Sequence, residues 1–440
     1  MVETENKDKV AERNRSYENY KKSGISWLED IPAHWKLKRF KHIFHEKKKT
    51  TNVELNCGSI SFGKVVYKDD DKVPESTKSS YQVLSTGEFL INPLNLNYDL
   101  ISLRIALSDK DVVVSSGYIV IQNIIKIDKS YFKWLLHIFD VAFMKTLGAG
   151  VRQTLSFNHI ANSEFVYPPL LEQTKIAQFL DDKTTKIDAA IGIKEQQIDL
   201  LKERKQILIH KAVTRGLDDN VTLKDSGVEW IGEIPEHWEV KALRYISDSF
   251  PSNVDKHSKP TEKEVRLCNY TDVYKNDYIT DDMDLMIATA TEDQIKKFRL
   301  FKGDIVITKD SETASDIAVP TYIVEELTNV VCGYHLSVIK PNKDIYGQYL
   351  FRALQCKAFN VQFEIESNGI TRVGLGTSDM RKAKFLVPPL SEQKQISFYI
   401  ETASQKIETA ISIKEQEIEK LKEYKGSLIN SVVTGKIKVC

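Results

Sequence analysis

The chain has 440 residues and a mass of 50.4 kDa, enough for two or three domains that each bury a core. It carries 62 Lys and Arg against 62 Asp and Glu, and this zero net charge excludes a uniformly basic coat for nucleic acid but not a local basic patch. No apolar run approaches a membrane span, and the charged N-terminus does not resemble a secretory signal. Five widely spaced cysteines are typical of reduced cytosolic thiols rather than of disulfides or a zinc site.

Two motifs occur twice, in the same order. Residues 23–35 read SGISWLEDIPAHW, and residues 226–238 read SGVEWIGEIPEHW. Residues 168–180 read PPLLEQTKIAQFL, and residues 388–400 read PPLSEQKQISFYI. The chain is therefore two tandem copies of one design.

The segments between these motifs, 36–167 and 239–387, share only scattered residues. A repeated frame around two dissimilar inserts predicts one scaffold that presents two different recognition surfaces; the alternative is a duplication whose loops have drifted. Both inserts have the patterns of mixed α and β structure. We expect strands at 112–114, 118–121, 305–307 and 336–339, and helices at 130–147 and 345–363.

Each insert carries a glycine-containing turn with an arginine in its last part. The turns are GAGVRQTL at 148–155 and NGITRVGL at 368–375, and Arg152 and Arg372 stand 220 residues apart. A fork-shaped guanidinium on such a turn suits a phosphate or the edge of a guanine. The alternative is a surface pair with a carboxylate, but the recurrence in both copies favours the contact.

Charge is distributed unequally between the inserts. The first is slightly basic and the second slightly acidic, so a DNA surface on the second insert has to be a local patch. The available cations form either such a patch or an ordinary solvated face: Arg266, Lys296, Lys297, Arg299, Lys302 and Lys309.

A long helix is expected after each Pro-Pro-Leu. Proline suits the residue before a helix, and Glu172 and Glu392 suit its positive first turn. From Glu172 to Val213 the helix would extend roughly 63 Å. Gly216 and Gly435 are expected as C-caps.

Apolar residues on both helices alternate in steps of four and three, which predicts a coiled-coil seam. The simplest arrangement is an antiparallel pair, a pseudo-twofold rod with one globular domain near each end. Polar seam residues, including Lys194, Lys205 and Lys425, either fix the register or cover the seam with their stems. The apolar seam residues are Leu180, Ile187, Ile191, Ile198, Leu201 and Leu208 in the first copy, and Ile400, Ile407, Ile411, Ile418, Leu421 and Leu428 in the second.

Motifs of self-sufficient catalysis are missing from the sequence. It has no GxxxxGK[ST] phosphate loop, GxGxxG fingerprint, HExxH pair, CxxC pair or GxSxG elbow. The repeated His34 and His237, each followed by tryptophan, are expected to pack where a domain meets the helices. We therefore predict that the chain is not an enzyme by itself and has no catalytic residues, metal site or cofactor of its own.

The arrangement resembles the specificity subunit of type I restriction-modification systems. The resemblance rests on the doubled Ser-Gly to His-Trp motif, the doubled PPL-x-EQ motif, the repeated KEQ-bearing helices and the two dissimilar inserts, and it covers nearly the whole chain. It implies an α+β fold of two mixed α/β target recognition domains joined by an antiparallel coiled coil, with an internal pseudo-twofold repeat. The implied divisions are a tail at 1–22, recognition domains at 23–168 and 218–388, and spacer helices at 169–217 and 389–440.

The resemblance also implies partners and a place of action. Each recognition domain would read one half of a bipartite site in double-stranded DNA, and the helices would fix the spacer. Two adenine methyltransferase subunits and the restriction and translocase subunits would bring S-adenosylmethionine, ATP and Mg²⁺. The expected location is the prokaryotic cytoplasm, with no membrane. A protein that bridges two partners without binding DNA is the alternative.

Residue type and loop placement indicate which side chains would contact DNA. Besides the two turn arginines, Gln153 and Asn158 could pair with adenine, and Arg104 follows a polar loop. The complete set of expected DNA contacts is Arg104, Arg152, Gln153, Asn158, Arg266, Lys309, Thr371 and Arg372.

Overall fold

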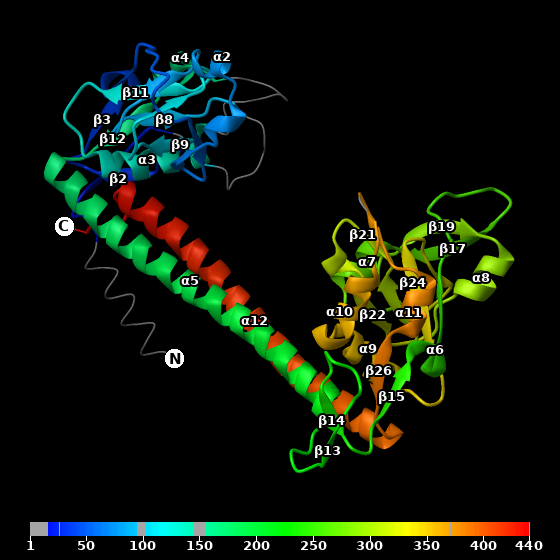
Figure 1. The fold of residues 1–440 in the computed structure, drawn as a ribbon. Coiled ribbons are helices and arrows are strands. Elements are labelled where there is room, and N and C mark those ends of the chain that lie inside the picture. Colours follow the sequence, from blue (N-terminus) through cyan, green and yellow to red (C-terminus); the bar gives the residue numbers. More distant parts are fainter. Residues whose placement is uncertain (1–15, 26, 95–102, 145–154, 370, 440) are drawn as a thin grey trace. The chain divides into compact units, whose positions relative to one another are not determined.

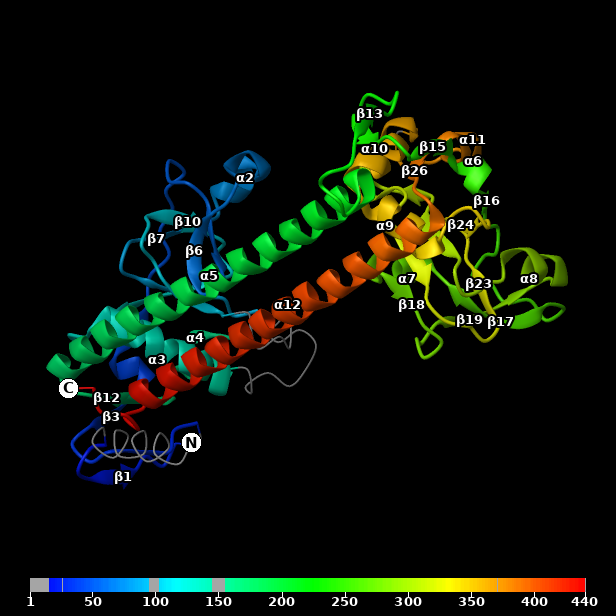
Figure 2. The same cartoon turned by 90° about the horizontal axis from the view of Figure 1, so that it is seen from below.

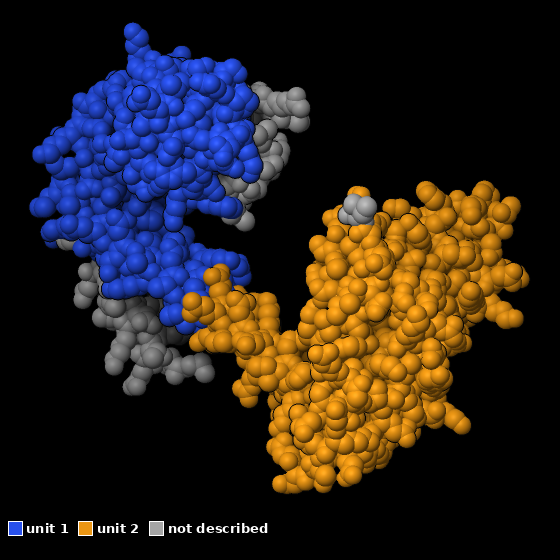
Figure 3. Space-filling view, in the orientation of Figure 1, with its two compact units in different colours: residues 1–194, 416–440 blue, residues 195–415 orange. Residues whose placement is uncertain are grey.

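The computed structural model describes residues 16–25, 27–94, 103–144, 155–369 and 371–439. The chain divides into two compact units (Figure 3): unit 1 is residues 1–194 and 416–440, and unit 2 is residues 195–415. Each unit combines one globular domain with parts of both long helices, α5 (Leu170–Arg215) and α12 (Leu390–Val433) (Figure 1). The predicted fold class of two mixed α/β domains with two long helices is confirmed.

The globular part of unit 1 is built on an antiparallel sheet in the order β4-β11-β8-β9. Helix α3 (Lys129–Ala142) packs against it and buries Phe132, Leu136 and Phe139 in the core. The sheet strands are β4 (Phe44–Glu46), β8 (Phe89–Ile91), β9 (Ile105–Leu107) and β11 (Ile119–Asn123). The smaller elements are β1 (Tyr20–Lys22), β2 (Asp30–Pro32), β3 (Lys36–Arg39), β5 (Gly58–Ser61), β6 (Lys64–Tyr67), α2 (Glu75–Lys78), β7 (Gln82–Leu84), β10 (Val112–Val114), α4 (Phe157–Ile160) and β12 (Glu164–Tyr167).

Unit 2 contains a five-stranded sheet in the order β16-β24-β20-β22-β18 and a three-stranded sheet in the order β19-β17-β23. The strands of these sheets are β16 (Ser247–Pro251), β17 (Lys263–Cys268), β18 (Tyr278–Ile279), β19 (Met286–Ala290), β20 (Ile305–Thr308), β22 (Pro320–Ile323), β23 (Val330–Cys332) and β24 (Leu336–Pro341). Around them lie β13 (Leu223–Asp225), β14 (Glu233–Pro235), β15 (Glu239–Ala242), α6 (Leu243–Ile246), α7 (Tyr270–Lys275), α8 (Glu292–Phe298), β21 (Asp310–Ser311), α9 (Gly347–Gln355), α10 (Lys357–Glu366), β25 (Val373–Gly374), α11 (Thr377–Lys382) and β26 (Lys384–Val387).

The expected strands are confirmed as β10, β11, β20 and β24, and the helix expected at 130–147 corresponds to α3. The helical stretch expected at 345–363 is formed by two helices, α9 and α10, which are separated at Cys356, whose backbone is extended at ψ 124°. The break lets α10 turn so that Phe359 and Phe363 pack against Phe385 of β26.

The repeated motifs close each domain at its base. Strand β3, directly after His-Trp, pairs antiparallel with β12, directly before Pro-Pro, and β15 pairs with β26 in the same way. Because the two ends of each insert are bonded to one another, the sequence between them can change while the base stays the same. This explains how a repeated frame holds two unlike inserts.

A carboxylate in the first turn of each long helix holds the His-Trp motif. Trp35 is fully buried, and its Nε1 donates to Glu172 Oε2 at 2.9 Å, while His34 Nε2 lies 2.7 Å from Glu172 Oε1. In unit 2, His237 Nε2 lies 2.8 Å from Glu392 Oε2. The expected packing of these residues where a domain meets the helices is confirmed.

The glutamine of each PPL-x-EQ motif ties a long helix to its own domain. Gln173 and Gln393 are fully buried. Each accepts a hydrogen bond from a backbone N–H that precedes a domain helix, Asp128 at 2.9 Å and Tyr346 at 2.6 Å. Each Nε2 also donates to the carbonyl of the first proline of its motif, at 2.8 Å.

A tyrosine in each domain binds the last turn of the other copy's helix. The Tyr131 hydroxyl donates to the carbonyl of Val433 at 3.1 Å within unit 1, and the Tyr349 hydroxyl donates to the carbonyl of Val213 at 3.4 Å within unit 2. Each domain is thus attached both to the start of the helix that follows it and to the end of the helix from the other copy.

Within each unit α5 and α12 run antiparallel along the predicted seam (Figure 2), and all twelve apolar seam residues are buried or half-buried. Seam lysines reach carboxylates on the opposite helix: Lys425 lies 2.7 Å from Asp188 in unit 1, and Lys205 lies 2.8 Å from Glu408 in unit 2. These pairs form in only one alignment of the helices, which favours a role in fixing the register. The expected C-caps are also confirmed: Gly216 and Gly435 have φ of 79° and 82°.

Candidate nucleic-acid interface

In unit 2 several loops meet beside the end of β20. Strand β21 pairs with β25, which brings the glycine turn against the loop that follows β20. His335 Nδ1 lies 2.7 Å from Asp310 Oδ2, and the Tyr270 hydroxyl donates to Ser311 Oγ at 3.3 Å. We name this group the β21 surface, and its members are Tyr270, Lys309, Asp310, Ser311, Tyr334, His335, Thr371 and Arg372.

Arg372 and Thr371 are exposed on this surface. Arg372 forms no ion pair with any residue that the structure describes, so the guanidinium has no carboxylate partner that would hold it to the protein. Three residues later, Leu375 is buried, and its N–H donates to the carbonyl of Lys309 at 2.9 Å. The turn is therefore anchored at its base and presents its arginine to solvent.

The other members of the β21 surface lie around the ion pair of Lys309 and Asp310. Lys309 Nζ lies 3.7 Å from Asp310 Oδ2, and the same carboxylate fixes the imidazole of His335. His335 has φ of 72°, a left-handed conformation that is uncommon for a residue other than glycine and is often found at functional sites. Cation, carboxylate and hydroxyl groups lie together here beside an imidazole, and cations, carboxylates and hydroxyls are groups that read base edges.

Aromatic side chains border the β21 surface. The rings of Tyr270 and Tyr274 stack at 5.7 Å with an interplanar angle of 14°. The charge of the Asp316 carboxylate, together with a hydrogen bond to it, raises the pKa of the exposed Tyr274 phenol. Flat rings next to hydrogen-bonding groups suit contact with a nucleic acid.

Arg266 lies on β17, and its side chain is turned into the protein. Nη1 is 2.5 Å from Asp281 Oδ1, and Nη2 donates to the carbonyls of Asp281 at 2.7 Å and Met283 at 2.8 Å. Hydrogen bonds from Thr328, together with Arg266, lower the pKa of the Asp281 carboxyl. These bonds hold Arg266 between loops of the second domain, and the DNA contact expected of it stays a prediction.

In unit 1 the residues expected to contact DNA differ in their placement. Arg152 and Gln153 lie outside the described residues. Asn158 is exposed on the short helix α4. Arg104 is only 6% exposed, and its Nε donates to the buried Asp140 Oδ1 at 2.8 Å, so it joins β9 to α3 instead of facing solvent. Desolvation of an unpaired guanidinium would be costly, which explains why this arginine sits on a carboxylate.

Within the described residues, no helix is long and apolar enough to cross a bilayer. In the same part of the chain, no three or more His, Cys, Asp or Glu side chains gather where they could hold a metal ion.

Two unlike domains on one repeated frame define a two-domain scaffold protein. A family model described as the type I restriction modification DNA specificity domain matches residues 32–203 and 235–423. The chain belongs to this family. It is a type I restriction-modification specificity subunit with two target recognition domains, as the resemblance in its sequence predicts.

Relatives and a solved structure agree with this assignment. The chain is 25% identical over 462 residues to the type I restriction enzyme MjaX specificity subunit of Methanocaldococcus jannaschii, covering 96% of this chain and 97% of that protein. It is 22% identical over 256 residues to the EcoKI specificity subunit of Escherichia coli, covering 56% of this chain and 53% of that protein. A chain from a solved type I restriction-modification system matches with a TM-score of 0.67 at 13% identity, over 92% of this chain and 99% of that one, which is a likeness of fold.

Proposed function

We propose that each target recognition domain reads one half of an asymmetric bipartite DNA site, and that the helix pair sets the spacer and docks two methyltransferase subunits. The observation that carries this proposal is the repeated frame: the paired strands β3–β12 and β15–β26 close two unlike inserts onto equivalent helix ends. Equivalent mounts suit two identical partner subunits, whereas unlike inserts suit two different half-sites.

The β21 surface is the proposed reading surface of the second domain. Arg372 would contact a guanine edge or a phosphate, and Lys309 and Thr371 would assist it. In the first domain the proposed contacts are Arg152, with Gln153 and Asn158 as residues suited to adenine. Arg104 and Arg266 are left out because the carboxylates of Asp140 and Asp281 hold their side chains against the protein.

The chemistry would belong to the partner subunits. We place S-adenosylmethionine with the methyltransferase, and ATP and Mg²⁺ with the restriction and translocase subunits. A methyltransferase that modifies adenine has to turn the base out of the stacked duplex. This chain would then determine where on the DNA the reaction takes place, and the partner subunit would supply the reacting groups.

The proposal is tested by a methylation map. The chain is co-expressed with its cognate methyltransferase in a host without DNA methylation, and the native DNA is sequenced for N6-methyladenine. The expected result is a bipartite motif that is modified once on each strand. Replacing residues 36–167 by the corresponding segment of a relative should change one half of the motif and leave the other half unchanged.

Two results would contradict the proposal. A soluble, assembled complex that left no methylation would favour the alternative of a protein bridging two partners without DNA. A replacement of 36–167 that altered both halves would show that the domains do not read independently.

Arg372→Ala is expected to weaken binding of the cognate site by about 1–3 kcal/mol, or roughly 5–150-fold, if the guanidinium reads a base. Sites with a different base at one position of the second half-site would then also be methylated, while the sequence of the first half-site stays unchanged. If the contact is to a phosphate, the affinity for all DNA sequences would decrease by a similar factor. The slope of log K against log salt concentration would become smaller by about 1. The measurements are methylation maps and binding titrations at several salt concentrations.

The matched control is Arg381→Ala, which removes an exposed arginine from α11 in the same domain. It should leave both the motif and the salt slope unchanged. Wild-type specificity and salt slope in Arg372→Ala would rule out the assigned contact.

A further inference from the structure

In unit 2, all three guanidinium nitrogens of a buried arginine donate hydrogen bonds to protein groups. Arg352 of α9 is 1% exposed, and its Nε and Nη2 donate to the two carboxylate oxygens of Glu401 at 2.8 and 3.0 Å. Nη2 also donates to the Tyr278 hydroxyl at 2.6 Å, and Nη1 donates to Gln355 at 2.6 Å and Asp277 at 3.4 Å. Burial opposes the charge, but the hydrogen bonds to Glu401 raise the pKa of Arg352, so it remains a cation.

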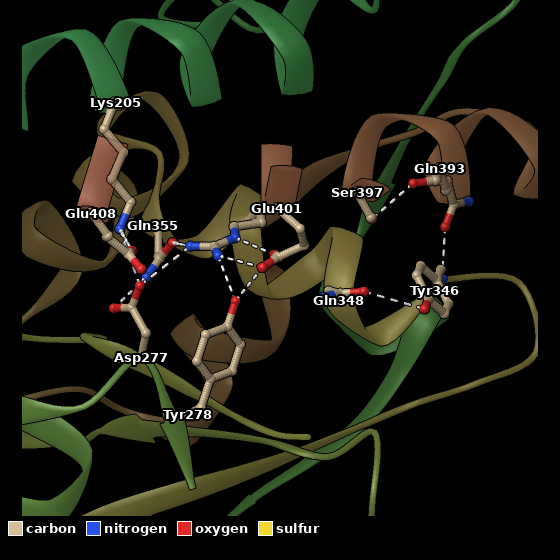
Figure 4. Close-up of polar contacts among 11 residues, drawn as sticks. Lys205, Asp277, Tyr278, Tyr346, Gln348, Gln355, Gln393, Ser397, Glu401 and Glu408 are labelled. Atoms are coloured by element: carbon tan, nitrogen blue, oxygen red, sulfur yellow. Dashed lines mark hydrogen bonds and ion pairs between the residues drawn. The ribbon is translucent and has the colours of Figure 1, made fainter. Parts of the chain in front are cut away.

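This network joins three parts of unit 2 (Figure 4). Asp277 and Tyr278 belong to the recognition domain, at the start of β18, whereas Glu401 lies on α12. Lys205 of α5 lies 3.3 Å from Asp277 and 2.8 Å from Glu408 of α12. The domain is therefore bonded to both helices at one place, remote in sequence from the paired strands that close its base.

The first unit has a simpler contact at the equivalent helix position. Asp181 stands 220 residues before Glu401 and accepts hydrogen bonds from Trp134 Nε1 at 2.9 Å and Lys133 Nζ at 3.1 Å. Both partners lie on α3. A carboxylate of the long helix thus binds the domain in each unit, but in unit 2 it holds a buried bidentate arginine. Such a pair is geometrically specific and tolerates little displacement.

We propose that Arg352 is a positioning residue for sequence recognition: it fixes the angle of the second recognition domain on the helix pair and so restricts the complex to one spacer length. The inference rests on the proposed function, because it presupposes that the two domains read two half-sites. Arg352 contacts no DNA in this proposal. It acts through the orientation of the β21 surface.

The geometry of DNA explains why an angle matters. Moving a half-site by one base pair shifts it by about 3.4 Å along the duplex and turns it by about 34° around the axis. A domain that could tilt on its helices would follow such a shift and accept a second spacer. The network opposes tilting because a rotation of α9 against α12 breaks the paired bonds between Arg352 and Glu401, and the buried guanidinium then loses the carboxylate that binds it at two nitrogens.

The experiment compares the methylation maps of Arg352→Met, Glu401→Gln and the wild type, each co-expressed with the methyltransferase. The expected result is that both half-site sequences stay the same, while methylation of sites with a spacer one base pair longer or shorter rises about tenfold over the wild-type level, since losing a buried ion pair shifts the population of tilted domains. A purely structural role would lower methylation without changing the spacer.

The control is Lys357→Ala, which removes an exposed ion pair with Glu364 in the same domain and should keep the wild-type spacer. Thermal unfolding establishes that each variant folds, and if Arg352→Met does not fold, Glu401→Gln and Tyr278→Phe decide the question. Folded variants with the single wild-type spacer would overturn the inference, and so would variants that lose the sequence of the second half-site. Failure of the proposed function is distinct, because the wild type itself would then show no bipartite motif.

Discussion

Deletion of residues 426–440 is expected to unfold the globular part of unit 1, although these residues lie far from it in sequence. Leu428, Ile429, Val432 and Val433 are buried in the same core as the residues of α3. Removing a single such side chain typically costs about 2–5 kcal/mol, and a whole domain is stable by only about 5–15 kcal/mol. Hydrogen exchange measured by mass spectrometry should show loss of protection across α3 and β11.

Unit 2 provides an internal control for this deletion. All of its residues, 195–415, remain in the shortened chain, so its amides should keep their protection. A second control is a chain that ends at Ile437, which retains the buried last turn of α12. If the chain without residues 426–440 kept full protection in α3, the last turn of α12 would not be part of the first domain's folding unit.

Trp35→Ala is expected to lower the free energy of unfolding of unit 1 by about 3–5 kcal/mol, because it empties a fully buried aromatic site at the base of the domain. The milder change to phenylalanine should distinguish the two copies. Trp35 donates to Glu172, and a hydrogen bond to a charged group contributes about 1.5–3 kcal/mol. The buried Nε1 of Trp238 has no partner within the described part of the chain, so its removal should cost less.

Denaturant unfolding, followed by hydrogen exchange in each unit separately, measures this difference. The control is Trp230→Phe, which changes an exposed tryptophan of unit 2 and should have little effect. Equal losses for Trp35→Phe and Trp238→Phe would show that the indole bond to Glu172 does not contribute to stability.

Features that depend on local periodicity could be predicted from the sequence. The heptad positions of α5 and α12 are set by spacing alone, and residues such as Ile187 and Ile407 are buried as expected. The repeated motifs also predict the shared base of the two domains, because the same residues meet the same partners in both copies. Each motif alone is a weak indication, and its occurrence twice in one chain makes the prediction specific.

Features that depend on distant partners could not be predicted. Arg104 and Arg266 have the sequence context of loop cations, but Asp140 and Asp281 hold them against the protein. The β21 surface requires four separate segments to meet, so His335 and Tyr270 gave no signal in the sequence. Arg352 lies in an apolar helical pattern, and its burial is explained by partners distant in sequence: Asp277, Tyr278 and Glu401.

Unit 1 is built from two segments distant in sequence, residues 1–194 and 416–440, and this has a consequence for how the protein folds as it is synthesised. The first recognition domain leaves the ribosome early, but its core is complete only when the last turn of α12 has been synthesised. At about 5–20 residues per second, the first domain would wait for about 10–50 s with part of its apolar surface uncovered. Unit 2 is complete at residue 415, before the last turn of α12, so it would fold first and the order of folding would be the reverse of the order of synthesis. The first recognition domain would then be the part of a new chain most open to chaperones, proteases and misassembly.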